Sequence, residues 1–236
     1  DVEFLHTAAT PFPQNPIKEE FVDSGELGIK STLLGRKMVL NAAVFYNHWK
    51  DQQVFNVGAT GPVFSNLPAS EIYGGEVELK LSPDNTWLIT ASLGLLHSEI
   101  TDATGLDFDK GEGEYQKGHA LALVPNVSAN FAIAKDVTLG TSRLSLQADG
   151  RYQGTSKVKY KPSHPIDEYE SRFVANLRAD LGLGRDHRYT LGAYLENLTG
   201  AQFCLEKQDL HVLVGAYYCV PNEGQVQFGL QARIGF

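Results

Sequence analysis

Apolar and polar residues alternate along most of this chain, and the final segment QVQFGLQARIGF (225–236) shows the alternation without a break. Gln, Gly and Arg occupy every second position there, and the positions between them hold Val226, Phe228, Leu230, Ala232, Ile234 and Phe236. Successive side chains of a β-strand point to opposite faces, so the segment predicts a strand with one apolar face and one polar face. Such a strand could line a soluble core or face lipid.

Eight earlier segments repeat this period of two, which predicts about nine strands of roughly 10 to 15 residues each. These segments are 25–35, 38–49, 72–82, 86–96, 125–134, 143–153, 172–183 and 188–200. The predicted fold class is therefore all-β.

The connections between the predicted strands alternate in length. Short turns are expected near residues 35, 84, 136 and 185, and long connections over about 56–69, 99–118, 156–168 and 203–223. An antiparallel meander places successive connections at opposite ends. Short turns at one end and long loops at the other are typical of transmembrane β-barrels of outer membranes.

Charged residues fall on the polar side of these strands. A charge that faces lipid at mid-depth costs about 2–4 kcal/mol, so this segregation favours a membrane barrel with a charged lumen. A soluble β-sandwich, with strands of about 5 or 6 residues, is the alternative. The predicted lumen-facing charges are Glu76, Glu78, Arg143, Asp149, Arg151, Arg172, Arg178, Asp180 and Arg233. Aromatic residues near strand ends fit interfacial girdles: Tyr46, Trp87, Tyr152, Phe173, Tyr189 and Phe236.

The remaining composition narrows the classes further. No apolar run approaches the roughly 18 residues of a membrane helix. The net charge of −8, without a basic cluster among aromatics, argues against nucleic-acid binding. Residues 1–20 predict a loop or the end of a preceding strand, with no signal peptide and no initiator Met. An odd strand count does not suit a closed antiparallel barrel, so we expect 21–236 to be the C-terminal part of a larger one, unless residues 1–15 supply a tenth strand.

The two cysteines, Cys204 and Cys219, lie close together near the end of the chain. Their spacing does not match a redox CxxC motif, and two ligands without neighbouring histidines make a poor metal site. We expect a disulfide that closes a loop, which would indicate an oxidising compartment or the cell surface.

Four segments resemble the barrel of TonB-dependent outer-membrane receptors. They are NPIKEEFVDSGELGIKSTLLGRKMVLNAAVFYNHWKDQQ (15–53), YGGEVELKLSP (73–83), YLENLTGAQF (194–203) and QVQFGLQARIGF (225–236). Each motif is weak alone, and their order and spacing are more specific. The resemblance spans nearly the whole chain.

The resemblance implies one part of a barrel of about 22 strands. It also implies an N-terminal plug domain, TonB as the energy-coupling partner, and outer-membrane lipid around the barrel. The expected function is import of a scarce bulky nutrient, either an iron–siderophore complex, cobalamin or a glycan, without enzymatic activity and without a cofactor. A passive porin or a barrel enzyme is the alternative. No catalytic motif such as GxSxG or HExxH occurs in the chain.

Candidate ligand-binding residues lie near the expected extracellular ends and loops, where aromatic rings could stack on a sugar or siderophore. They are Trp49, Phe55, Tyr115 and Tyr160, with His211 as a candidate iron or haem contact. Four acidic residues could bind calcium, although a solvated loop is favoured: Asp107, Asp109, Glu112 and Glu114. The terminal Phe236 resembles the signal that outer-membrane assembly machinery reads.

Overall fold

The computed structural model describes residues 17–58, 61–106, 115–158, 168–184, 186–210 and 216–235. Within these ranges the regular structure is entirely β, and no helix is long and apolar enough to cross a membrane. The main sheet contains β1 (Phe21–Leu33), β2 (Met38–Gly58), β3 (Gly61–Leu81), β4 (Trp87–Asp102), β5 (Val127–Leu139), β6 (Ser142–Gln153), β9 (Arg172–Leu183), β10 (Tyr189–Glu196) and β13 (Gln227–Ile234). Two small sheets pair β7 (Ser156–Lys157) with β8 (Glu168–Tyr169), and β11 (Phe203–Leu210) with β12 (Ala216–Asn222).

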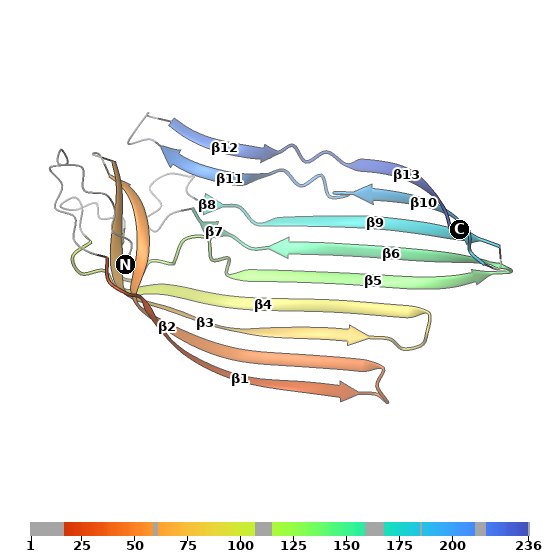
Figure 1. Ribbon diagram of the computed structural model, residues 1–236, viewed down its shortest axis with the longest axis horizontal. Helices are drawn as coiled ribbons and strands as arrows, with labels where there is room; N and C mark the ends of the chain where they lie inside the picture. The colour runs from red at the N-terminus through yellow and green to blue at the C-terminus, as the bar shows by residue number, and fades with distance from the viewer. Residues whose placement is uncertain are drawn as a thin grey trace.

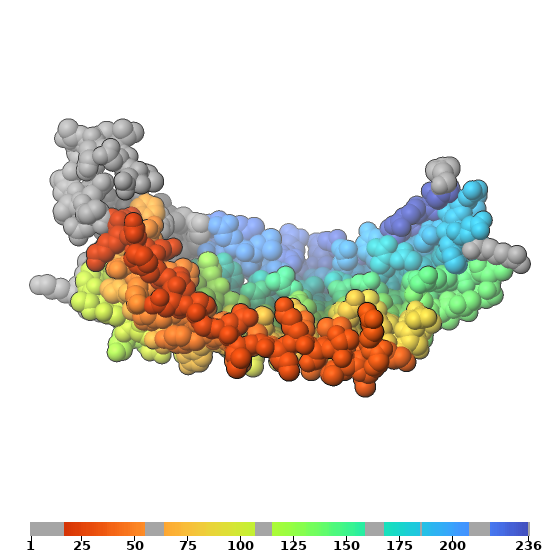
Figure 2. Space-filling view, turned by 60° about the horizontal axis from the view of Figure 1, so that its bottom comes forward, coloured from red at the N-terminus to blue at the C-terminus, as the bar shows by residue number. Residues whose placement is uncertain are grey.

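The main sheet is an antiparallel meander. Its strand order is β1-β2-β3-β4-β5-β6-β9-β10-β13, and β1 and β13 form its two margins (Figure 1). This confirms the predicted all-β fold class and the count of nine strands. The space-filling view shows a single curved layer, hollowed between its ends (Figure 2).

The pairing register keeps apolar side chains on one face across the whole sheet. One row of directly opposed residues crosses all nine strands: Leu33, Met38, Leu81, Ile89, Ile133, Ala148, Leu177, Leu195 and Phe228. A neighbouring row on the other face runs Leu88, Ala134, Gln147, Arg178, Tyr194 and Gly229. Because directly opposed residues share a face, the sheet has an apolar face and a polar face, and we use these names below.

The two ends of the sheet differ in their connections. Strand pairs β1–β2, β3–β4, β5–β6 and β9–β10 are joined by two to five residues at the turn end. The β4–β5, β6–β9 and β10–β13 connections are longer or carry their own strands, and they lie at the loop end, as does the far end of the β2–β3 hairpin (Figure 1). At the turn end, Leu34, Gly35 and Arg36 all have positive φ angles, so a tight turn reverses the chain there.

Two sequence-based boundaries are wrong. Lys135 and Asp136 lie inside β5, and the turn comes later, at Gly140 with φ +64°. The connection expected over 56–69 is largely strand, because β2 and β3 remain paired up to Gly58 and Gly61. Their backbone hydrogen bonds continue the hairpin beyond the level at which the neighbouring strands end.

The exposed surface is far larger than that of a soluble domain of this size. The chain exposes 16005 Å², whereas a folded monomer of 25.9 kDa would expose about 10,500 Å². Much of the excess is apolar: Leu230 is 80% exposed, Phe228 77% and Leu27 76%. A sandwich would cover such side chains with a second sheet. The apolar face of the main sheet therefore lacks the partner layer that a soluble β-sandwich requires.

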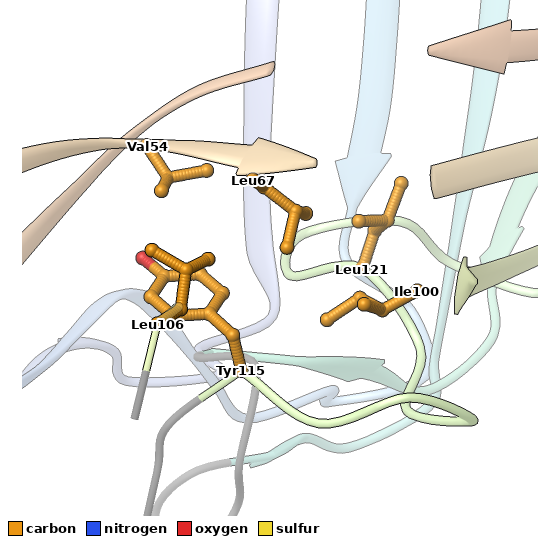
Figure 3. Close-up of a cluster of buried hydrophobic side chains, with 6 residues drawn as sticks. All are labelled: Val54, Leu67, Ile100, Leu106, Tyr115 and Leu121. Carbon is orange, nitrogen blue, oxygen red and sulfur yellow. The ribbon is translucent and has the colours of Figure 1, made fainter. Parts of the chain in front are cut away.

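Across the described ranges the buried hydrophobic residues form one cluster, and it lies at the loop end. Val54 and Leu67 from the extended β2–β3 hairpin meet Ile100 at the end of β4, and residues of the following connection close over them. The cluster is drawn in Figure 3 and consists of Val54, Leu67, Ile100, Leu106, Tyr115 and Leu121. Backbone hydrogen bonds of Ile100 to His119 and of Gly118 to Ile100 fasten this connection beside β4. The loop end thus has its own packed core.

Removing a buried side chain from this cluster should loosen the loop end and leave the main sheet intact. Leu67 is fully buried, so Leu67→Ala should cost about 2–5 kcal/mol locally. Hydrogen exchange of the Gly118 and Leu121 amides should accelerate, and that of β6 and β9 should stay unchanged. Leu123→Ala is the matched control, because Leu123 is 65% exposed. Equal exchange in both variants would contradict the role of the cluster.

Candidate ligand-binding site

Charged and amide side chains on the polar face are linked by hydrogen bonds. The Arg178 Nε donates to Asp180 Oδ2 at 2.6 Å, and the Gln231 amide donates to Asp180 Oδ1 at 3.1 Å. Asp149 accepts a hydrogen bond from the Asn176 amide at 2.8 Å. These bonds form two groups of partly exposed side chains on the polar face, one joining β6 to β9 and one joining β9 to β13.

The nine charges predicted to face a lumen all lie on the polar face by register. Arg143 pairs with Asp136, whose other oxygen accepts from Ser145. The Asn41 amide reaches Glu78 at 3.4 Å. The full set is Glu76, Glu78, Arg143, Asp149, Arg151, Arg172, Arg178, Asp180 and Arg233.

A cavity of about 530 Å³ opens at the loop end between the start of β9 and the β11–β12 hairpin. We call it the loop-end pocket. It is lined by Tyr169, Glu170, Arg172, Gln202, Phe203, Cys204, Lys207, Cys219, Pro221, Asn222 and Glu223. Its size falls within the ~300–1,000 Å³ of typical small-molecule sites. Three separate elements contribute to it: β8, β9 and the β11–β12 hairpin.

Cations and aromatic rings alternate around the loop-end pocket. The Arg172 guanidinium lies 4.4 Å from the Phe203 ring centroid and donates to Gln153 Oε1 at 2.7 Å. The Lys207 ammonium lies 5.6 Å from the Tyr169 ring and donates to the Glu168 carbonyl at 2.6 Å. Arg151 is a diagonal neighbour of Arg172 on the same face, since Arg172 pairs with Gln153. Among the described residues, neither Arg151 nor Arg172 has a carboxylate in ion-pair contact.

The β11–β12 hairpin is held by a disulfide between Cys204 and Cys219, with Cα atoms 5.5 Å apart. The Lys207 amide also donates to the Tyr169 hydroxyl at 2.9 Å, which ties the hairpin to β8. Partial burial, followed by hydrogen bonding to Glu206, raises the pKa of Tyr218 in β12.

Trp49 and Tyr115, the predicted ligand contacts whose side chains the structure describes, are not among the residues that line this pocket. Trp49 lies on the polar face of β2, half-buried, and its buried indole N–H has no hydrogen-bond partner among the described residues. The backbone of Phe55 pairs with Phe64 in the β2–β3 extension. Tyr115 is only 1% exposed and belongs to the hydrophobic cluster, so it offers little surface to a ligand.

Several other predicted positions lie outside the described residues. These are Tyr160, His211, the acidic set Asp107, Asp109, Glu112 and Glu114, and the terminal Phe236. Within the described ranges, no group of three or more His, Cys, Asp or Glu side chains could hold a metal ion.

Sequence patterns did not single out Tyr169, Phe203 or Lys207. All three lie near the cysteines or in a Pro-containing connection, where no strand period marks a face. The cysteine pair was the one sequence signal for these pocket residues, because a disulfide between the two cysteines closes the loop and places Lys207 next to β12.

Comparison with known families decides the class of the chain. The family model described as "TonB dependent receptor-like, beta-barrel" matches residues 4–198. The chain belongs to the TonB-dependent receptor family. The resemblance drawn from the sequence motifs is thereby confirmed. A comparison with curated protein sequences found no significant match.

Solved structures of receptors share the fold. The ferric yersiniabactin uptake receptor FyuA from Yersinia pestis has a TM-score of 0.69 at 20% identity, over 92% of this chain and 30% of that one. The siderophore receptor PiuA from Acinetobacter baumannii has a TM-score of 0.67 at 19% identity, over 90% and 28%. The copper transporter OprC has a TM-score of 0.64 at 17% identity, over 94% and 32%. This chain thus spans about a third of the length of these barrel proteins.

The disulfide should leave neither Cys204 nor Cys219 with a reactive thiol. Labelling intact cells with a membrane-impermeant maleimide should modify neither Cys204 nor Cys219 until a reductant is added. A Cys204→Ser, Cys219→Ser double variant should have a free energy of unfolding lower by about 3 kcal/mol in this loop, because the disulfide no longer restrains the unfolded chain. Proteases should then cleave within 203–222. Two reactive thiols in the untreated protein would contradict the bridge.

Proposed function

We propose that this chain is part of an outer-membrane receptor that imports an iron–siderophore complex with energy supplied through TonB. The observation that carries the proposal is the separation of apolar and charged residues onto opposite faces of one uncovered sheet, in a chain of this family. Receptors of this family are transporters and not enzymes.

In this proposal the apolar face contacts membrane lipid. Its aromatic residues lie in two bands, with Tyr46 and Tyr73 toward the loop end and Trp87 and Tyr189 toward the turn end. Aromatic girdles mark both interfaces of such barrels, and long loops are extracellular. The loop end therefore faces outward and the turn end faces the periplasm.

The polar face then lines the lumen of a barrel of about 22 strands and meets a plug domain. The edges of β1 and β13 would pair with further strands, because unpaired backbone groups are not tolerated in lipid. TonB would act on the receptor through the plug.

The loop-end pocket supports a negatively charged, partly aromatic substrate. Arg172 and Lys207 line the pocket as cations, with the exposed Glu170 and Glu223 as its lining carboxylates, and Arg151 adds a positive charge beside Arg172 outside the lining. Chelates with anionic oxygen groups suit guanidinium donors and aromatic faces. A receptor of similar fold, the ferric yersiniabactin uptake receptor, takes up a ligand of this class. Cobalamin and glycans are the less favoured substrates, since neither requires such a charge.

Uptake of radiolabelled iron tests the proposal in cells that produce the full-length receptor. Among ferric catecholate, hydroxamate and carboxylate complexes, at least one should be taken up only in cells with functional TonB. The Arg172→Gln and Lys207→Gln variants should each bind that complex about tenfold more weakly or worse, since charge-assisted hydrogen bonds are lost. Lys117→Gln, exposed at the same end but outside the pocket, should bind normally.

Uptake that continues without TonB would instead indicate a passive pore. Uptake of none of these complexes would overturn the assignment of substrate class. Equal binding by all three variants would remove the loop-end pocket from the site.

Lipid contact has a separate test. Leu93 lies in the middle of the apolar face, and Thr90 lies on the polar face of the same strand. Leu93→Arg should lower the free energy of unfolding in lipid vesicles by about 2–4 kcal/mol, because the charge would face hydrocarbon. Thr90→Arg should lower the free energy of unfolding much less, because its charge would lie on the polar face. Equal losses in the two variants would contradict the orientation of the sheet.

A further inference from the structure

A shallow cavity of about 620 Å³ lies on the apolar face and runs from the start of β4 toward β13. Small residues form its floor: Ala148, Ala179 and Ala193 lie on the adjacent strands β6, β9 and β10. Larger side chains form its walls, including Leu146 on one side and Phe228 on the other. We call this depression the alanine groove.

One end of the alanine groove carries a positive charge. Lys135 lies on the apolar face of β5, directly opposite Trp87. In the described strands, every other ionised side chain on this face lies toward the loop end, as Asp23, Lys50 and Glu71 do. Among the described strands, Lys135 is therefore the single cation of the apolar face toward the turn end, where the proposed orientation places the inner leaflet.

The Lys135 ammonium is held in a fixed position. It lies 4.5 Å from the centroid of the Trp87 ring and donates a hydrogen bond to the Thr86 hydroxyl at 2.6 Å. An ammonium has three hydrogens, so two remain for another acceptor. The nearest carboxylates are Asp84 in the adjacent turn and Asp136, which follows on the polar face and pairs with Arg143.

Asp84 is already engaged elsewhere. Its Oδ1 accepts hydrogen bonds from both the amide and the hydroxyl of Thr86. These bonds, with the Lys135 charge as a smaller cause, hold the pKa of Asp84 below its ordinary value. The Thr86 hydroxyl thus donates to Asp84 and accepts from the Lys135 ammonium.

We propose that the alanine groove binds one phospholipid of the inner leaflet, with the phosphate on Lys135 and an acyl chain over the three alanines. Trp87 is an interfacial residue at the level of the headgroups, and the groove continues from it into the apolar band. Anionic phosphate complements the lone cation, and hydrocarbon complements the apolar floor. The proposal depends on the membrane placement given above and is independent of which substrate is imported.

Native mass spectrometry of the full-length receptor with phosphatidylglycerol tests the site. The unmodified receptor should retain one lipid after mild delipidation. Lys135→Gln should weaken its binding about fivefold, the contribution of one basic residue near a membrane surface. Lys135→Arg should restore binding, and Ala193→Leu should weaken it by filling the groove. Heat-modifiable migration on gels verifies that each variant is folded.

Two matched controls separate a site from ordinary surrounding lipid. Lys37→Gln removes a cation from another turn at the same end, and Ala129→Leu enlarges an alanine of the apolar face outside the groove. Both should retain the lipid. Equal lipid retention by all variants would overturn the proposal, as would equal losses in the controls.

A competition experiment with inorganic phosphate tests whether the acyl chain contributes to binding. Excess phosphate should not displace the lipid, because the acyl chain contributes to its binding. Displacement by phosphate alone, or a co-purifying polypeptide in place of lipid, would also overturn the proposal. Uptake of the iron complex should be normal in Lys135→Gln, so failure here is distinguishable from failure of the transport assignment.

Discussion

The structure depends on one constraint, the unbroken antiparallel register of the main sheet. A strand shifted by one residue would turn every side chain to the opposite face. The row from Leu33 to Phe228 remains apolar across nine strands, and the adjacent polar row carries Arg178 and Gln147. Short turns such as that around Gly35 fix this register at one end. Both faces of the sheet, and so both proposed surroundings, follow from that register.

The strands were predictable from the sequence because the alternation of apolar and polar residues shows directly which face of the sheet each side chain lies on. Leu144, Leu146 and Ala148 alternate with Arg143, Ser145 and Gln147, and backbone pairing preserves the separation. Strand ends were less predictable. Lys135 interrupts the apolar series of β5 and resembles a turn residue, yet cation–π contact with Trp87 accommodates it inside the strand.

The candidate site was harder to predict than the sheet. Tyr169 and Lys207 are 38 positions apart, and their contact depends on how a small hairpin folds back onto β8. The sequence also does not show whether an aromatic side chain near a strand end packs into a core or lines a pocket. Tyr115 entered a local core, whereas Phe203 remained in the pocket beside Arg172. Residue type and approximate location were insufficient where no period identifies a face.

The hydrophobic cluster at the loop end has a consequence for how such a receptor diversifies. Its contacts join residues 54 to 121 without using the apolar face of the sheet. Substitutions that reshape the outer rim can therefore be tested by selection without disturbing strand register or membrane insertion. The loop end has a packed core of its own, so its stability and that of the barrel wall depend on different contacts.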